Sequence, residues 1–166
     1  ENYALYGEID LRADRFLPGL FFTIGARYDV EDFRSTITTP IAGTQNSSTS
    51  FSAFLPKLGA TYEFHEQHRL SFTIQRGYRA GGVEIVRDGT VNDFDAEFST
   101  NYELAYRGGF YEDRLRLSAN AYFTDWRDQQ VSVDTGSLTD QGLVIFRTEN
   151  AGRSELRGFE VSIEGQ

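Results

Sequence analysis

The chain has 166 residues and a formal net charge of −9, with no cysteine and a single lysine, Lys57. The lack of cysteine excludes disulfides and thiolate metal sites, and the negative charge argues against binding to nucleic acids or, by simple electrostatics, to anionic lipid surfaces. The mean hydropathy of −0.45 indicates no transmembrane helix.

The first predicted element is a long strand from Tyr3 to Ala13. Its odd positions are mostly apolar, whereas its even positions include Glu8, Asp10 and Arg12. Successive side chains of a strand point to opposite faces, so this segment has one apolar and one charged face. It is about twice as long as an ordinary strand of about 5–6 residues. Such a strand suits a sheet that lies between lipid and water.

Six later segments repeat the same alternation, and none shows helical periodicity with caps. They are residues 20–31, 57–63, 70–75, 101–108, 115–124 and 159–164. The sequence therefore predicts an all-β fold, an antiparallel up-and-down meander of seven long strands. In this arrangement every strand pairs with its neighbour in the sequence.

The links between these segments alternate in length. Short turns are predicted at 14–19, 64–69 and 111–113, and longer polar loops at 33–50, 80–98 and about 134–142. Short turns on one rim and long loops on the other are typical of outer-membrane barrels. We expect the loops 33–50 and 80–98 to be the least ordered parts. Aromatic residues near the strand ends fit girdles at the two membrane interfaces.

Five segments of the chain carry a family resemblance. They are PKLGATYEF at 56–64, GYRAGG at 77–82, NYELAYRGGF at 101–110, YFTDWRDQQV at 122–131 and ENAGRSELRGFEVSIEG at 149–165. In this order they resemble the barrel of TonB-dependent outer-membrane receptors. The resemblance implies a 22-stranded transmembrane barrel with an N-terminal plug domain. It also implies uptake of ferric siderophores, or of cobalamin, haem or sugars, driven by the TonB complex.

The predicted number of strands suggests a piece of a larger barrel. Bacterial single-chain barrels close with an even number of strands, and an open seven-stranded sheet leaves two edges unpaired. We therefore expect residues 1–166 to be a mid-to-late part of a barrel domain, without the plug. The expected location is the bacterial outer membrane. The expected partners are its lipid, a ferric siderophore or similar substrate, and the TonB complex through the missing plug.

The candidate ligand-binding residues are Tyr78, Arg79 and Trp126. Arg79 lies in GYRAGG, whose glycines free the backbone where a strand leaves the wall. It either contacts a plug or ligand, or only lines the lumen beside a turn. Arginines suit anionic ferric siderophores, and aromatic faces suit catecholates or haem. Trp126 lies on the polar face with Tyr122 unless a bulge reverses the register.

A second set of residues is predicted to face the lumen. It comprises Arg27, Asp29, Asn101, Glu103, Arg107 and Arg116. Glu103 and Arg107 stand about 13 Å apart along one strand, too far to pair directly. We expect them to pair across strands, for example with Arg79 or Arg116. In the last strand a β-bulge is expected near Gly152 or Gly158.

No catalytic residue, metal site or cofactor is predicted, and we expect no enzymatic activity. His65 and His68 lie in one short turn, and a metal ion would need more ligands. Asp93, Asp95 and Glu97 are of the kind that binds calcium, but a solvated acidic loop is the favoured interpretation.

The alternative to a receptor is a soluble β-barrel or sandwich module that binds a small ligand. In that fold the apolar face of each strand would point into the interior, and the charged face would point to solvent. Enclosing the charges instead would cost several kcal/mol for each unpaired group. The receptor interpretation is therefore preferred.

Overall fold

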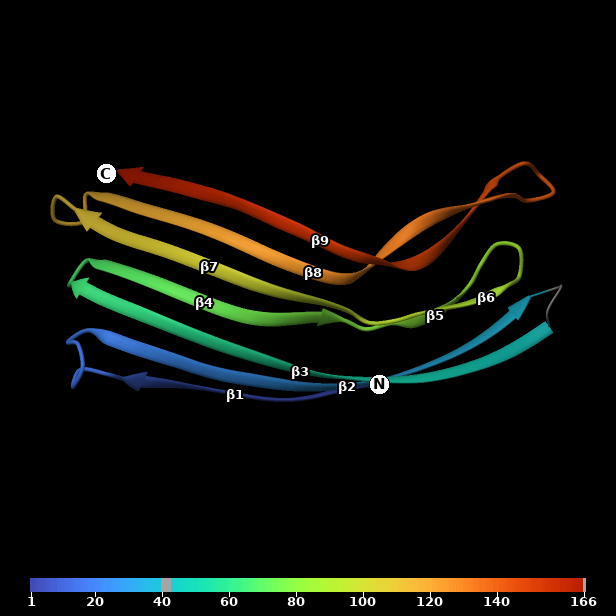
Figure 1. Ribbon diagram of the computed structural model, residues 1–166, viewed down its shortest axis with the longest axis horizontal. Coiled ribbons are helices and arrows are strands. Elements are labelled where there is room, and N and C mark those ends of the chain that lie inside the picture. Colours follow the sequence, from blue (N-terminus) through green and yellow to red (C-terminus); the bar gives the residue numbers. More distant parts are fainter. Residues whose placement is uncertain (40–42, 166) are drawn as a thin grey trace.

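A computed structural model describes residues 1–39 and 43–165. The elements are all strands: β1 (Asn2–Arg12), β2 (Leu20–Thr39), β3 (Gly43–His65), β4 (His68–Arg79), β5 (Gly82–Ile85), β6 (Val91–Phe94), β7 (Glu97–Phe110), β8 (Leu115–Leu138) and β9 (Val144–Gly165). Seven of them form one antiparallel sheet in the order β1-β2-β3-β4-β7-β8-β9, and β5 and β6 form a separate hairpin (Figure 1). This confirms the predicted all-β meander of seven strands. Within the described residues, no helix is long and apolar enough to cross a membrane.

The strand register gathers the apolar residues onto one face of the sheet. One row across six strands consists of Ile9, Ile24, Leu58, Ile74, Tyr102 and Phe123. The adjacent row, which points to the opposite face, consists of Glu8, Gly25, Lys57, Gln75, Asn101 and Thr124. On this polar face the Lys57 ammonium lies 2.8 Å from the Glu8 carboxylate, across the intervening Gly25. The period-two pattern of the sequence thus becomes two chemically different faces.

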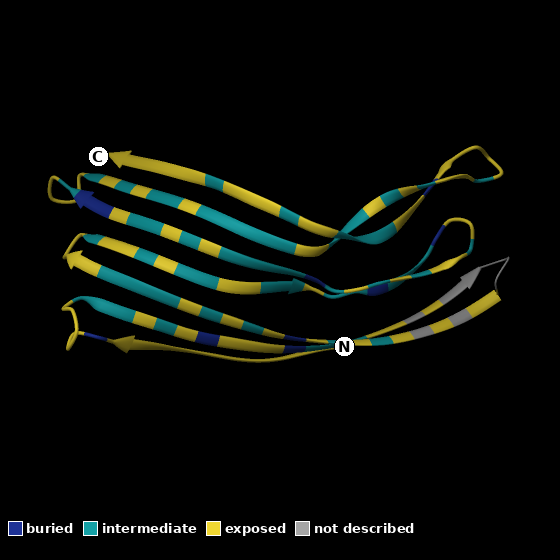
Figure 2. Cartoon of the chain, in the orientation of Figure 1, coloured by how far each residue is buried: buried dark blue, intermediate teal, exposed yellow. Residues whose placement is uncertain are grey.

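The apolar face is not covered by any of the residues that the structure describes. Among the described residues, the buried hydrophobic side chains are Ala13, Ala53, Val86 and Ile145, whereas Leu104 is 46% and Phe159 is 81% exposed. Figure 2 accordingly shows exposed and half-buried positions along most strands, and few buried ones. A soluble small-ligand module would bury this face, so that alternative does not fit the structure.

The described residues of the three longer loops predicted from the sequence lie largely in strands, so this part of the prediction was wrong. Residues 40–42 of the predicted loop 33–50 lie outside the described residues. The pairing of β2 with β3 continues without a break from Asp32 and Ser50 to Thr39 and Gly43. Residues 80–98 contain the β5–β6 hairpin, and β8 extends to Leu138. Ser, Thr and Asn occupy both sets of alternate positions in 33–50, so no period-two signal marks these strands. The order of these segments in solution stays a prediction.

The last strand is more regular than predicted. The register of β9 against β8 is continuous from Gly165 to Arg153, and its shift lies between Asp134 and Leu138 of β8. The ladder has a gap at Asp128 and Gly152, where Asp128 has a φ of 54°, and pairing resumes in the same register at Gln129 and Ala151. No extra residue is inserted at Gly152 or Gly158, so the expected bulge was wrong, although the ladder is interrupted at Gly152. Gly158 instead makes room for an aromatic ring, because a Cβ there would lie 2.6 Å from the Tyr122 hydroxyl.

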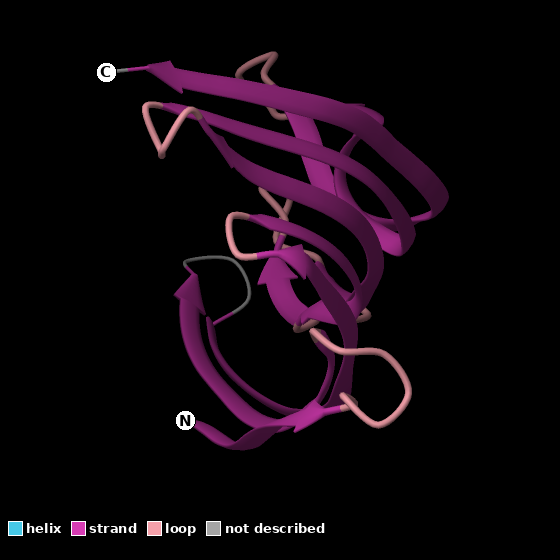
Figure 3. Ribbon diagram, turned by 90° about the vertical axis from the view of Figure 1, so that its left-hand side faces the viewer, coloured by secondary structure: helices cyan, strands magenta, loops and turns pink. Residues whose placement is uncertain are grey.

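The sheet divides at the end that carries the long hairpins. The pairing of β3 with β4 ends at Lys57 and Gln75. Beyond this point β3 pairs only with β2, while β4 continues along β7 as far as Arg79 and Glu97. Figure 3 shows the sheet bending into an arc between the two termini. The division opens a space between β2 and the end of β4, on the polar side.

Candidate ligand-binding site

A hollow of about 660 Å³ lies where the sheet divides. Its volume is in the range of small-molecule sites, about 300–1,000 Å³. Its walls come from β2, from the end of β4 and from the β5–β6 hairpin. The lining includes Arg27, Asp29, Glu31, Phe33, Leu55, Tyr78, Arg79, Val83, Phe94 and Gln130.

A bidentate ion pair forms the β2 side of the hollow. The Nε and terminal nitrogen atoms of Arg27 each donate to a carboxylate oxygen of Asp29, both at 2.7 Å. Asp29 is only 2% exposed, whereas half of the Arg27 side chain is accessible. The buried carboxylate therefore fixes the plane of the guanidinium, whose remaining donors face the hollow.

Tyr78 and Arg79, two of the three candidate ligand-binding residues, form the opposite side of the hollow, and their binding of a ligand stays a prediction. The Tyr78 hydroxyl donates to Glu31 of β2 at 3.5 Å, and its ring stacks on Phe98 at 6.2 Å. Tyr78 thus bridges the gap between the two parts of the sheet. Arg79 is 68% exposed and lies 3.9 Å from the buried carboxylate of Glu97. The hollow therefore presents two accessible guanidinium groups beside one phenol.

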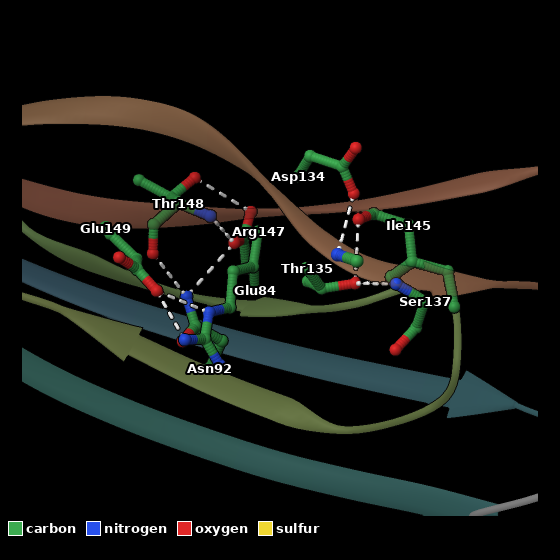
Figure 4. Close-up of polar contacts among 10 residues, drawn as sticks. Glu84, Asn92, Asp134, Thr135, Ser137, Ile145, Arg147, Thr148 and Glu149 are labelled. Carbon is green, nitrogen blue, oxygen red and sulfur yellow. Dashed lines mark hydrogen bonds and ion pairs between the residues drawn. The ribbon is translucent and has the colours of Figure 1, made fainter.

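The β5–β6 hairpin is held against β9 by side chains (Figure 4). The Glu84 carboxylate accepts hydrogen bonds from the main-chain nitrogen of Thr148, from its hydroxyl at 3.0 Å, and from the Asn92 amide at 3.1 Å. Asn92 also donates to the Thr148 carbonyl at 2.7 Å. Glu84 and Asn92 of the hairpin therefore bind the main-chain nitrogen and the main-chain carbonyl of Thr148 on β9.

Two amide side chains fix the base of the same hairpin. Gln130 of β8 donates to the carbonyl oxygens of Ala80 and Asp95, at 2.8 and 3.1 Å. The Asn150 amide of β9 donates to the main-chain carbonyl oxygens of Asp95 and Asp128, at 2.9 and 2.8 Å. Its oxygen accepts from the main-chain nitrogen of Asp95 at 2.8 Å. The hairpin is thus attached to β8 and β9 at its base and forms a wall of the hollow. The sequence analysis missed these residues because their partners lie far away in the chain.

The turn of the hairpin contains its own charged contact. The Asp88 carboxylate accepts from the hydroxyl and the main-chain nitrogen of Thr90, at 2.7 and 2.9 Å. These hydrogen bonds lower the pKa of Asp88 below its ordinary value. The contact therefore supports the turn at neutral pH and is lost as the pH falls through that lowered pKa.

Trp126 is not brought together with the other two candidates. It lies on the polar face, opposite Ser99 of β7, which in turn pairs with Gly77 of β4. One strand therefore separates it from β4, about 10 Å across the sheet. It does not belong to the lining of the hollow. The unbroken register places Trp126 and Tyr122 on the polar face, the first of the two predicted alternatives.

The register places all six residues predicted to face the lumen on the polar face: Arg27, Asp29, Asn101, Glu103, Arg107 and Arg116. The partners expected for Glu103 and Arg107, Arg79 or Arg116, were wrong. Arg79 pairs with Glu97, and Arg116 lies 4.0 Å from Asp113. Glu103 instead accepts a long hydrogen bond of 3.5 Å from Asn101. The actual partners of Arg79 and Arg116 are Glu97 and Asp113. Both lie outside the segments predicted as strands, so the alternation of the sequence did not indicate these contacts.

The two histidines belong to an aromatic cluster at the short-turn end. His68 lies 2.8 Å from the Tyr106 hydroxyl and packs edge-on against Phe110, with the ring centroids 4.9 Å apart. The ring of Phe64 also stacks on His68, with the centroids 5.7 Å apart. In the part of the chain that the structure describes, no three His, Asp or Glu side chains gather as a metal site would require.

The whole chain, residues 1–166, matches the family model of the TonB dependent receptor-like β-barrel. The chain belongs to this family. Solved barrels of similar fold agree with this assignment. The ferric yersiniabactin uptake receptor FyuA from Yersinia pestis is 21% identical, with a TM-score of 0.72 over 98% of this chain. The siderophore receptor PiuA from Acinetobacter baumannii is 17% identical, with a TM-score of 0.74 over 99% of this chain.

A third similar structure is the FrpB iron transporter from Neisseria meningitidis, which is 16% identical with a TM-score of 0.69 over 99% of this chain. The TonB-dependent barrel segment described here spans 23% of the length of each of these three proteins. The likeness concerns the fold of the barrel wall. It covers β1 to β9 almost completely.

Proposed function

We propose that this chain is a mid-to-late part of the barrel wall of an outer-membrane receptor that takes up ferric siderophores or similar large nutrients. The observation that carries the proposal is the polarity of the sheet. Its apolar face is exposed, whereas its polar face carries the charges and the hollow. A transmembrane barrel needs this distribution, with lipid outside and water inside. The family and the names of the similar structures support iron uptake as the process.

In this proposal the hollow contacts the substrate on its way through the barrel. Arg27 and Arg79 supply accessible cations for an anionic ferric complex, and Tyr78 supplies an aromatic face. Trp126 stands further along the same face and would meet the substrate outside the hollow. A plug domain and the TonB complex would act through parts of the receptor outside residues 1–166.

The test uses the complete protein that carries this chain, in cells deprived of iron. Arg79→Ala and Trp126→Ala are compared with the unmodified protein for uptake of radioactive iron. The probes are the ferric complexes of a tris-catecholate and of a tris-hydroxamate chelator. We expect Arg79→Ala to reduce uptake of the anionic catecholate complex at unchanged surface expression. Normal uptake by both variants would remove these residues from the substrate path, and loss of expression would assign them to folding of the wall.

A matched control is Arg114→Ala. Arg114 is exposed and lies in the short turn between β7 and β8, at the opposite end of the sheet from the hollow. Its replacement removes the same charge from the chain. Equal loss of uptake in Arg114→Ala and Arg79→Ala would show that net charge, and not the hollow, is responsible.

A further inference from the structure

The apolar face of the sheet changes its chemistry over three consecutive rows that cross β4, β7, β8 and β9. The rows are Ile74, Tyr102, Phe123 and Arg157; then Arg76, Thr100, Asp125 and Glu155; then Tyr78, Phe98, Arg127 and Arg153. The side chains of these rows alternate with those of the polar face, so they lie on the side of Leu104 and Phe159. Tyr78 is the exception, because it stands at the free edge of β4 and turns across the gap to Glu31 in the hollow. An arginine-rich patch therefore begins where the apolar surface ends, toward the long hairpins.

The arginines of this patch are oriented by their neighbours. The guanidinium carbon of Arg76 lies 4.2 Å from the centre of the Phe98 ring. Asp125 accepts from the Nε atoms of Arg153 at 2.6 Å and of Arg127 at 3.3 Å. The two arginines are still 56% and 68% exposed, whereas Asp125 is 14% exposed. One partly covered carboxylate thus holds two guanidinium groups through their Nε atoms. A terminal nitrogen of Arg153 also lies 3.2 Å from Glu155, and both guanidinium groups stay largely accessible.

The patch carries excess positive charge although the chain as a whole is acidic. It contains four arginines, Arg76, Arg127, Arg153 and Arg157, and two carboxylates, Asp125 and Glu155. Arg76 and Arg157 form no ion pair among the described residues. The excess is local: on the same face of β2, the positions from Tyr28 to Asp32 include no basic residue. The patch is therefore a feature of one half of the sheet.

The partner that fits such a patch is the phosphate of a membrane lipid. The boundary between apolar and charged side chains is where the headgroups of a bilayer would lie if the apolar face meets lipid. Planar guanidinium groups bind phosphate through two parallel hydrogen bonds, and aromatic rings such as Phe98 suit the same interface. We propose that Arg76, Arg127, Arg153 and Arg157 bind phosphate groups of lipid in the leaflet next to the long hairpins. This rests on the proposed function, because it requires the apolar face to lie in the membrane.

The test measures lipid binding by the complete protein in bilayer discs of phosphatidylcholine. The added probe is either diphosphoryl lipid A or the same lipid with its phosphates removed. The variant Arg76→Gln with Arg157→Gln removes the two arginines that have no ion pair. The control, Arg107→Gln with Arg116→Gln, removes two arginines from the polar face of β7 and β8.

We expect the unmodified protein and the control to retain the phosphorylated probe about tenfold more strongly than the Arg76, Arg157 variant does. A second variant, Arg76→Lys with Arg157→Lys, should restore part of the binding because it keeps the charge. Equal binding of the two lipid probes, or equal loss in the control, would overturn the inference. Release of the lipid by inorganic pyrophosphate at equal concentration would also overturn it, because the site would then bind free phosphate.

The outcomes separate this inference from the proposed function. A protein that enters the discs but does not distinguish the two lipids overturns the lipid site alone. A protein that does not enter the discs at all overturns both.

Discussion

The Glu84 carboxylate accepts hydrogen bonds from both the main-chain nitrogen and the hydroxyl of Thr148, a residue 64 positions later in the chain. This contact joins the short β5–β6 hairpin to the wall formed by β8 and β9. The hairpin has only two strands of four residues each. Isolated hairpins are marginally stable in water, so side-chain contacts of this kind decide its position.

The first prediction is that Glu84→Ala releases the hairpin from β9. Hydrogen bonds to a charged group contribute about 1.5–3 kcal/mol each, and Asn92 and Thr148 would lose their acceptor. Hydrogen exchange of residues 82–94 should become faster, while exchange in β7 is unchanged. Asp93→Asn is the control, because Asp93 is exposed on the same hairpin. Unchanged exchange in Glu84→Ala would show that the amide contacts of Gln130 and Asn150 are sufficient.

The second prediction concerns Gly81, where the chain passes very close to β6. A Cβ at this position would collide with the carbonyl oxygen of Phe94 and lie 2.8 Å from a ring carbon of Phe51. Gly81→Ala should therefore destabilise the folded wall by about 1–3 kcal/mol, the usual effect of overpacking. The measurement is the unfolding of the complete protein in detergent, followed by its electrophoretic mobility with and without heating.

Gly152→Ala is the matched control for Gly81→Ala. Nothing lies within 4 Å of a Cβ at Gly152, and its φ is not positive. Alanine there should leave stability unchanged or slightly higher, because glycine weakens the interior of a strand. Similar destabilisation by both substitutions would mean that the close approach to Phe94 is not what requires glycine at position 81.

The third prediction distinguishes the two faces of β7. Leu104→Cys and Glu103→Cys introduce a thiol at adjacent positions that point to opposite sides of the sheet. In membranes, an environment-sensitive dye attached at position 104 should be quenched by nitroxide lipids, whereas the same dye at position 103 should not. Equal quenching at both positions would contradict the inference that the apolar face meets lipid.

The fourth prediction compares protection from exchange along the strands. Residues 33–39 and 43–50 pair only with each other. They form a two-stranded ribbon, because the pairing of β1 with β2 and of β3 with β4 ends before these residues. Tyr102 to Tyr106 of β7 lie between β4 and β8. Amide hydrogens of the two-stranded part should therefore exchange faster than those of β7. Slower exchange in residues 33–50 would indicate that other parts of the protein cover them.

The sequence predicted the fold where water and lipid impose different demands on the two faces. In β1 and in the first part of β8, apolar and polar residues alternate, so the type of each residue indicates which face it lies on. This alternation predicted both the strands and their register. Beyond the apolar band, as in β2 after Asp32, both faces are polar and the strands resemble loops. The β5–β6 hairpin was missed because each of its strands has only four residues, too few to show a clear alternation.

The candidate site was predicted only in part. The glycines around Arg79 marked the end of a strand, and Tyr78 and Arg79 do line the hollow. The hollow itself depends on where β3 and β4 stop pairing, which is a tertiary property. Its other wall comes from Arg27 and Asp29, about fifty residues earlier, and no local pattern connects them with Tyr78. Trp126 was grouped with these residues by its position in a motif, although a strand separates them.

The scarcity of buried side chains has a consequence for how such a protein can diverge. A domain with a close-packed interior constrains the shape of each core residue, because its neighbours must fit around it. Here, main-chain pairing specifies the sheet, and most outward positions require only that the residue be apolar. Exchanges such as leucine for phenylalanine on that face should be nearly neutral. This tolerance accounts for wall segments that share only 16–21% of their residues and still superimpose with TM-scores of 0.69–0.74.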